Sequence, residues 1–136
     1  MIAPKGAAVS KKPSSKIVWT GRVLSFLAGA PFILSAGMKL AQVQPVIDGM
    51  AKYGWPPSMI VPLGVLELSC VALYFIPPVS VLGAILLTGY IGGAIATDLR
   101  VGNPVYAQSI IGILVWGGLY LRDSRLHELM PLVRKP

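Results

Sequence analysis

Four long apolar runs constrain the fold more than any other feature of this sequence. They cover residues 17–40, 59–76, 79–96 and 106–121. A helix needs roughly 20 apolar residues to cross about 30 Å of hydrocarbon, and the backbone polar groups of a chain in lipid must be satisfied internally. No run alternates between apolar and polar residues as a half-buried strand does. We therefore expect an all-α fold, an integral membrane four-helix bundle formed by residues 16–122.

The composition does not suit a globule in water. Hydrophobic residues make up 54% of the sequence and charged residues only 12%, and the mean hydropathy is +0.71. Soluble domains carry about 25% charged residues. The net charge of +7 comes largely from basic residues that flank the apolar runs. A nucleic-acid binder places such charges on a folded face between stacking aromatic residues, so we expect no nucleic acid and a lipid bilayer as the partner.

Polar ends and proline turns divide the chain. Residues 1–15 are expected to form a disordered basic cytoplasmic tail, and residues 123–136 a cytoplasmic C-terminal tail. A cleaved signal peptide is the competing interpretation of the N-terminal region, but the first apolar run is too long for one. Pro77 and Pro78 separate the second and third runs, because proline lacks a backbone donor and restricts the residue before it.

The connection between the first two runs contains a short amphipathic segment. Residues 42–58 read QVQPVIDGMAKYGWPPS. Their apolar side chains recur at helical spacing, at Val43, Val46, Ile47 and Met50. This spacing predicts a short helix in the plane of the membrane interface, with Tyr53 and Trp55 at the level of the lipid headgroups.

The distribution of basic residues predicts the orientation. With both termini on one side, that side carries nine Lys and Arg residues and the opposite side carries three, Lys39, Lys52 and Arg100. Basic residues accumulate on the cytoplasmic side of membrane proteins. We therefore expect both termini in the cytoplasm.

Glu67 is the only charged residue between Met59 and Thr97. A charged acid at the centre of a transmembrane helix costs about 2.5–3.5 kcal/mol on insertion scales. Helical periodicity places Glu67 on the face that holds the small and polar residues of its run, so it should point into the bundle. Two interpretations stay open: a structural acid neutralised by an ion pair or hydrogen bond, and an acid that lines a cavity for a ligand or a proton.

Other polar residues could meet Glu67 or form a site with it. Lys39, Asp98, Arg100 and Gln108 end or begin their runs on the outer side. Arg22 lies in the inner half of the first run and reaches Glu67 only if the helices tilt suitably. Each has a simpler interpretation as well: Lys39 as an interface anchor, Asp98 and Arg100 as a solvated pair at a loop, and Arg22 as a side chain that extends to the inner surface.

Self-contained catalytic and metal motifs are absent from the sequence. Cys70 is the only cysteine and His127 the only histidine, so a disulfide within the chain and a metal site of clustered His and Cys ligands are excluded. We expect Cys70 to pack in the core and His127 to lie at the surface. Whether the chain is an enzyme stays open, and a non-catalytic subunit of a membrane oxidoreductase is one interpretation.

Small residues recur along the apolar runs. Gly21, Ser25 and Gly29 lie four apart on the first run, and Gly89 and Gly93 form a GxxxG pattern on the third. Small residues let helix backbones approach closely in lipid. They indicate either packing between helices of one chain or the seam of a homodimer.

Several of these segments together resemble the DoxX-like family of small four-helix membrane proteins. The resemblance rests on SAGMKL, YGWPP, PLGVLELSCVALYFIPP and LLTGYIGGAIATDLRVGNP. It implies a bacterial cytoplasmic membrane protein, and it implies that Glu67 matches an acid of the family's second span. Asp98 stands where many relatives are expected to carry a histidine. A few relatives are linked to quinone-coupled sulfur oxidation or act as accessory membrane subunits.

Three functions follow as hypotheses. The first is an accessory or small-molecule binding subunit, with a quinone as the candidate ligand and a membrane or peripheral protein as its partner. The second is a proton-coupled small transporter, although four helices leave little room for alternating access without a dimer. The third is a purely structural or assembly protein.

Overall fold

The computed structural model describes residues 14–129, and every regular element in that range is helical. The tail expected over residues 1–15 therefore falls almost wholly outside the described residues, as does the end of the C-terminal tail from residue 130. The elements are α1 (Ser15–Leu40), α2 (Gln44–Lys52), η1 (Pro57–Met59), α3 (Ile60–Phe75), η2 (Pro77–Val79), α4 (Ser80–Arg100), α5 (Tyr106–Arg122) and α6 (Ser124–Leu129).

The helix boundaries follow local signals in the sequence. Ser14 caps α1 by accepting a hydrogen bond from the Ile17 amide at 3.4 Å, which satisfies a donor that the first helical turn leaves free. Gly54 and Gly102 end the turns after α2 and α4 with φ angles of +79° and +78°, a conformation that costs glycine little. The expected short helix is present as α2, and α6 is an additional helix within the segment expected only as a tail.

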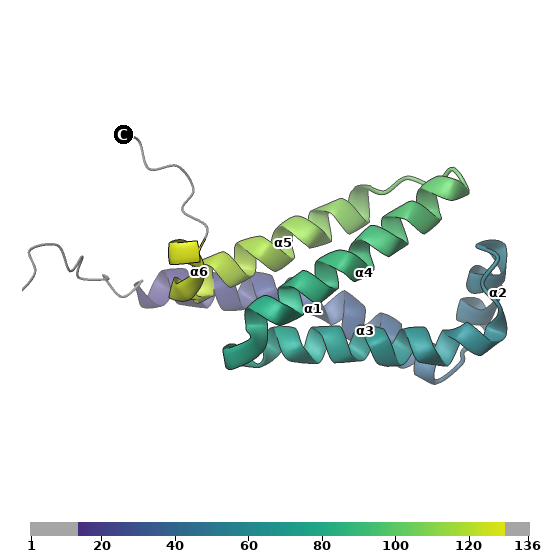
Figure 1. Ribbon diagram of the computed structural model, residues 1–136, viewed down its shortest axis with the longest axis horizontal. Helices are drawn as coiled ribbons and strands as arrows, with labels where there is room; N and C mark the ends of the chain where they lie inside the picture. The colour runs from purple at the N-terminus through teal and green to yellow at the C-terminus, as the bar shows by residue number, and fades with distance from the viewer. Residues whose placement is uncertain (1–13, 130–136) are drawn as a thin grey trace, which may run out of the picture.

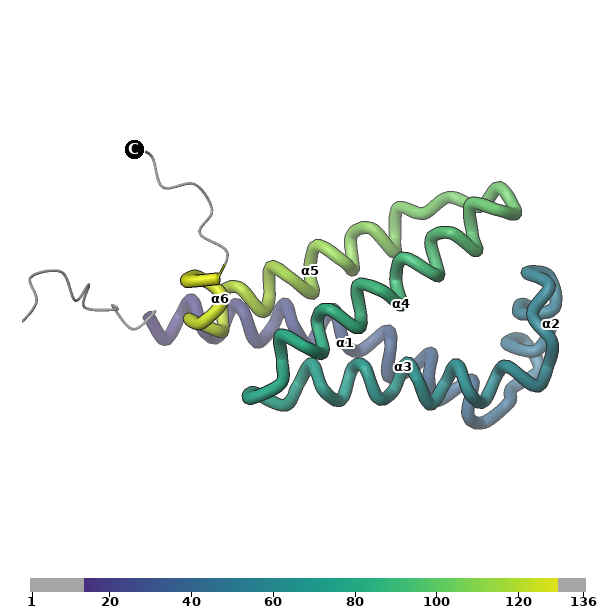
Figure 2. The backbone as a smooth tube through the Cα atoms, viewed as in Figure 1, coloured from purple at the N-terminus to yellow at the C-terminus, as the bar shows by residue number. Residues whose placement is uncertain are grey.

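The four long helices run antiparallel to their neighbours. α1 packs against α5 and α3, α3 packs against α4, and α4 packs against α5. In Figure 1, α3 and α4 meet at η2 and separate towards the end where α2 lies, while α6 lies at the opposite end beside the start of α1. The backbone trace in Figure 2 follows the same divergence.

Close approach of the helices occurs at particular glycines. A Cβ atom on Gly21 would lie 2.7 Å from the Arg122 amide nitrogen, and one on Gly83 would lie 2.2 Å from the Tyr74 amide nitrogen. Gly64 and Gly118 are similarly close to α1. By contrast, a Cβ on Gly89 or Gly93 would meet nothing within 4 Å in the described chain, so packing of this GxxxG pair against a helix of the same chain is not observed, and the homodimer seam stays a prediction.

The outer surface of the helices is strongly apolar. Phe26 on α1 is 64% exposed and Ile113 on α5 is 72% exposed, and many leucines and isoleucines of α3 and α4 are exposed too. The inward faces form a core that includes Ala28, Cys70, Tyr74, Leu87 and Leu119. Soluble monomeric proteins rarely expose large apolar patches, so the surface of these helices differs from the usual surface of such proteins.

Among the described residues, three helical segments are long and apolar enough to cross a membrane: Ser15–Leu40, Pro57–Phe75 and Pro77–Arg100. The fourth expected span is the helix α5, which has 17 residues. At 1.5 Å per residue it is about 25 Å long, which is shorter than the hydrocarbon core of a typical bilayer.

Candidate functional site

The central polar site joins α1, α3 and α4. Glu67 is 2% exposed, and its Oε2 atom lies 2.7 Å from the Lys39 Nζ atom. Ser35, one helical turn before Lys39, accepts a hydrogen bond from the Lys39 Nζ at 2.6 Å and donates one to Glu67 at 3.2 Å. Tyr90 on α4 donates a third hydrogen bond to the same carboxylate oxygen at 3.1 Å. The acid therefore has an ion pair and two hydroxyl donors inside the helices.

Local sequence explains why these side chains converge. Glu67 shares its helical face with Gly64, Cys70, Val71 and Tyr74, all buried, so the inward face was correctly predicted from helical periodicity. Gly64 allows α1 to approach, since a Cβ there would lie 2.9 Å from the Lys39 Cβ. This close contact brings Lys39 beside Glu67, with which it forms an ion pair.

A cavity of about 420 Å³ lies beside this ion pair, between α3 and α4 under the α2 end. Lys39 and Tyr90 contribute polar groups to its wall, and Tyr53 and Trp55 contribute aromatic ones. The other lining residues are Met50, Leu63, Leu66, Cys70, Leu86, Gly89, Gly93, Ala94, Thr97 and Asp98. Glu67 itself is not among them; of the three side chains that donate to its carboxylate, Lys39 and Tyr90 line the cavity and Ser35 does not.

A larger hollow of about 640 Å³ lies between α4 and α5. Its lining is almost wholly apolar and includes Gly92, Gly112, Gly117 and Trp116. None of the described residues in its wall has a charged side chain. We therefore place the candidate site at the smaller cavity, where ionisable groups and an apolar wall occur together.

Asp98 is the centre of a second polar group, at the wide end of the helices. Its carboxylate accepts hydrogen bonds from the Tyr53 hydroxyl at 2.7 Å, from the Asn103 amide at 3.1 Å and from Gln108. Arg100 donates to the Tyr53 backbone carbonyl. The hydrogen bond to Asp98 raises the pKa of the Tyr53 phenol above its ordinary value, and burial adds to this shift. These contacts tie the loop after α2 to the α4–α5 turn.

The six candidate residues from the sequence thus fall into three places. Lys39 and Glu67 form the ion pair, while Asp98, Arg100 and Gln108 belong to the polar group at the wide end. Arg22 lies at the opposite end, where it lines a cavity with Arg122 and Arg125. It does not approach Glu67, because its position on α1 is level with the C-terminal end of α5.

Ser35 and Tyr90 were not identified from the sequence, although both bind Glu67. Ser35 lies four residues before Lys39 and therefore on the same face of α1, which was a usable signal. Tyr90 is the one phenol of its apolar run, and a buried phenol normally has a hydrogen-bond partner. No group of three His, Cys, Asp or Glu residues within residues 14–129 could hold a metal ion.

Long apolar helices with an ion pair between them place this chain in the class of helical membrane proteins. More particularly, the sequence model of the DoxX-like family matches residues 23–118, and the chain belongs to that family. The resemblance noted from the sequence is thereby confirmed. The matched range contains Lys39, Glu67 and Tyr90. No curated protein and no solved structure shows significant similarity to the chain.

Proposed function

We propose that α1, α3, α4 and α5 all cross the bacterial cytoplasmic membrane, with both termini in the cytoplasm. The exposed apolar side chains of all four helices support this topology, as does the excess of Lys and Arg at the proposed inner end. The short helix α5 begins at Tyr106 and ends at Arg122, residue types that suit the membrane interfaces. The test is cysteine labelling in Cys70→Ala, where Asn103→Cys reacts with an impermeant maleimide outside cells and Ser124→Cys does not.

We further propose that the cavity between α3 and α4 binds a small apolar molecule of the quinone class. Its volume of about 420 Å³ falls within the range of small-molecule sites. Its wall is largely apolar, with a few polar groups from α1, the loop after α2 and α4, a combination that suits a flat ring with carbonyl oxygens. The single observation that carries the proposal is the presence of Lys39 and Tyr90 in that wall, both bonded to the buried Glu67.

Lys39 and Tyr90 have hydrogen-bonding capacity beyond their bonds to Glu67 and Ser35, and a ligand could use it. A lysine ammonium has three donors, and Ser35 and Glu67 use two of those of Lys39. Within residues 14–129 the third has no acceptor, which leaves it for a ligand carbonyl. The Tyr90 hydroxyl donates to Glu67 and keeps acceptor capacity for a ligand hydroxyl, as a quinol would present. Electrons for such a ligand would come from a partner subunit with its own cofactor, which makes this chain an accessory subunit.

Calorimetric titration of the purified protein with a short-chain benzoquinone tests this proposal. Lys39→Met should weaken binding at least about tenfold, because it removes a charged donor. Lys52→Met is the matched control, since Lys52 is exposed on α2 and does not line the cavity. Absence of binding by the wild-type protein, or equal affinity in the two variants, contradicts the proposal.

A structural role is the second candidate, favoured by the three hydrogen bonds that Glu67 already receives within the chain. The double variant Lys39→Met, Glu67→Leu separates the two roles. Replacing a buried ion pair by apolar side chains is often neutral for stability. A structural role predicts that this double variant keeps the protein's cellular phenotype, whereas a binding role predicts a folded protein that no longer binds the quinone.

A further inference from the structure

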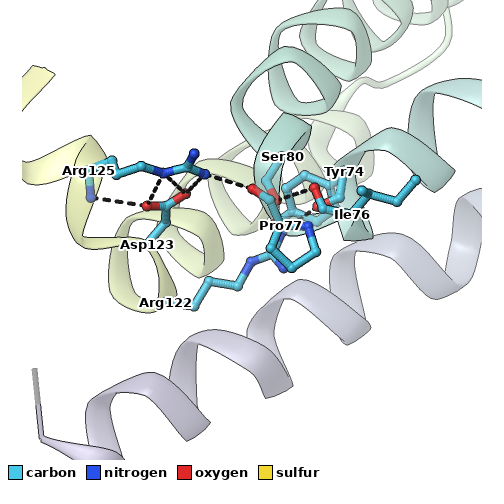
Figure 3. A network of polar contacts seen from close by, with 7 residues as sticks. All are labelled: Tyr74, Ile76, Pro77, Ser80, Arg122, Asp123 and Arg125. Carbon is cyan, nitrogen blue, oxygen red and sulfur yellow. Dashed lines mark hydrogen bonds and ion pairs between the residues drawn. The ribbon is translucent and has the colours of Figure 1, made fainter.

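A second charged cluster lies at the end of the molecule opposite α2. A cavity of about 520 Å³ opens where the α3–α4 turn meets the junction of α5 and α6. Arg22, Arg122 and Arg125 line it together with Asp123, Ser124 and the turn residues Pro77, Pro78 and Ser80. Figure 3 shows Arg122 and Arg125 extending from α5 and α6 towards this turn.

The charges of this cavity do not balance. Asp123 is paired with Arg125, whose guanidinium lies 2.6 Å from the carboxylate and also donates to the Pro77 carbonyl at 2.7 Å. Within residues 14–129, neither Arg22 nor Arg122 forms an ion pair with a carboxylate. The cavity lining therefore carries three guanidinium groups and one carboxylate, and that carboxylate is paired with Arg125.

Arg122 is held in place at this cavity. Its guanidinium donates to the Tyr74 carbonyl at 2.5 Å and lies 4.7 Å from the centre of the Tyr74 ring. Its Nε atom is buried and has no hydrogen-bond partner in the described part of the chain. Gly21 packs on the Arg122 backbone, which brings the next residue, Arg22, to the same level.

We propose that this cavity binds a phosphate group, supplied by the headgroup of an anionic phospholipid. Guanidinium groups match phosphate oxygens in geometry and charge, and two of those here form no ion pair with a carboxylate within residues 14–129. Trp19, one turn before Arg22, is 64% exposed and suits the headgroup region. A soluble phosphate ester carries the same chemistry and is the other source to be distinguished. The site shares no residue with the cavity beside Lys39 and goes beyond the proposed function.

Native mass spectrometry of the protein in non-ionic detergent tests this proposal with phosphatidylglycerol and phosphatidylcholine as probes. We expect preferential retention of phosphatidylglycerol and a loss of about tenfold in its affinity in Arg22→Gln, which removes a charge-assisted hydrogen bond. Lys52→Gln removes the same charge at the opposite end and should leave the affinity unchanged. Arg22→Lys should recover part of it, because a lysine restores charge without the planar fork.

Inorganic phosphate distinguishes the two sources. Displacement of the lipid by millimolar phosphate, in an Arg22-dependent manner, supports the phosphate site and assigns it to a soluble ligand. No displacement supports the lipid headgroup. Equal affinities for the two lipids without an effect of phosphate, or equal losses in Arg22→Gln and Lys52→Gln, overturn the proposal. Because Arg22 is exposed, we expect its substitutions to leave the fold intact. A preserved circular dichroism spectrum verifies that the variants are folded.

Discussion

The Lys39 ammonium lies 2.7 Å from the Glu67 carboxylate, and this pair joins the end of α1 to the middle of α3. The lysine side chain is 12% exposed and the glutamate side chain 3% exposed. Exposed ion pairs contribute little, but breaking a buried pair leaves an uncompensated charge. The same lysine borders the cavity between α3 and α4, so one contact serves both the packing of the helices and the proposed binding of a ligand.

Removing one partner of this pair should destabilise the protein strongly. We expect Glu67→Gln to lower the free energy of unfolding by about 3–5 kcal/mol, because it leaves the Lys39 charge unpaired. Unfolding by SDS in mixed micelles, followed by circular dichroism, measures the change. Asp123→Asn is the control, since the Asp123–Arg125 pair is more exposed and should change stability by less than about 1 kcal/mol. Equal effects of the two substitutions would contradict this interpretation.

Adjacent glycines on α5 should respond oppositely to alanine. A Cβ on Gly118 would lie 2.7 Å from the Ser25 hydroxyl and 2.8 Å from the Ser25 amide nitrogen, whereas one on Gly117 would meet nothing within 4 Å in the described chain. We expect Gly118→Ala to cost about 1–3 kcal/mol through overpacking. Gly117→Ala should be neutral or stabilise the helix by up to about 1 kcal/mol. The same unfolding assay compares them, and similar values would show that α1 and α5 are not closely packed there.

The Asp123–Arg125 pair should give a measurable pH dependence. The Arg125 guanidinium holds the pKa of the Asp123 carboxyl below its ordinary value. The contribution to stability is therefore present above the unfolded-state pKa of about 3.9 and is lost as the pH falls through the folded-state value. We expect the difference in melting temperature between wild type and Asp123→Asn to shrink as the pH is lowered from 6 to 3. A difference that is constant over this range contradicts the assignment.

The Tyr53 phenol should titrate late because it donates to Asp98. Its pKa is raised in the folded protein, so its contribution to stability is present below the ordinary value of about 10 and is lost as the pH rises through the folded-state value. Asp98→Asn should move the titration of Tyr53 back towards the ordinary value. Tyrosinate absorbance, with Tyr53→Phe as the reference for this phenol, measures the shift. An unchanged titration in Asp98→Asn would show that this hydrogen bond has no such effect.

Much of the fold follows from local rules of sequence. The turn at Pro77 and Pro78 separates α3 from α4 at its predicted position, because proline acts on its own backbone and on the residue before it. The inward direction of Glu67 followed from the helical period alone. Predicted boundaries missed the last turn of α4, which continues to Arg100.

Helical periodicity alone could not identify the residues that bind Glu67. Helical periodicity gives the face of each helix but not its tilt or height relative to the others, so Lys39 and Arg22 were both candidates. Close contacts at Gly64 and Gly21 settle the question, because they fix α1 against α3 at one end and against α5 at the other. The open space at Gly89 and Gly93 likewise depends on the divergence of α3 and α4, which no local pattern encodes.

The most direct test of the central claim compares two neighbouring glycines of α4. A Cβ on Gly92 or on Gly93 would meet nothing within 4 Å in the described chain, but Gly93 lines the cavity beside Lys39 and Gly92 lines the apolar hollow between α4 and α5. Calorimetric titration with a short-chain benzoquinone should therefore show at least about a tenfold loss of affinity in Gly93→Leu, whose side chain fills the cavity, and wild-type affinity in Gly92→Leu. Wild-type binding by Gly93→Leu, or an equal loss in both variants, would contradict a ligand site beside the Lys39–Glu67 pair.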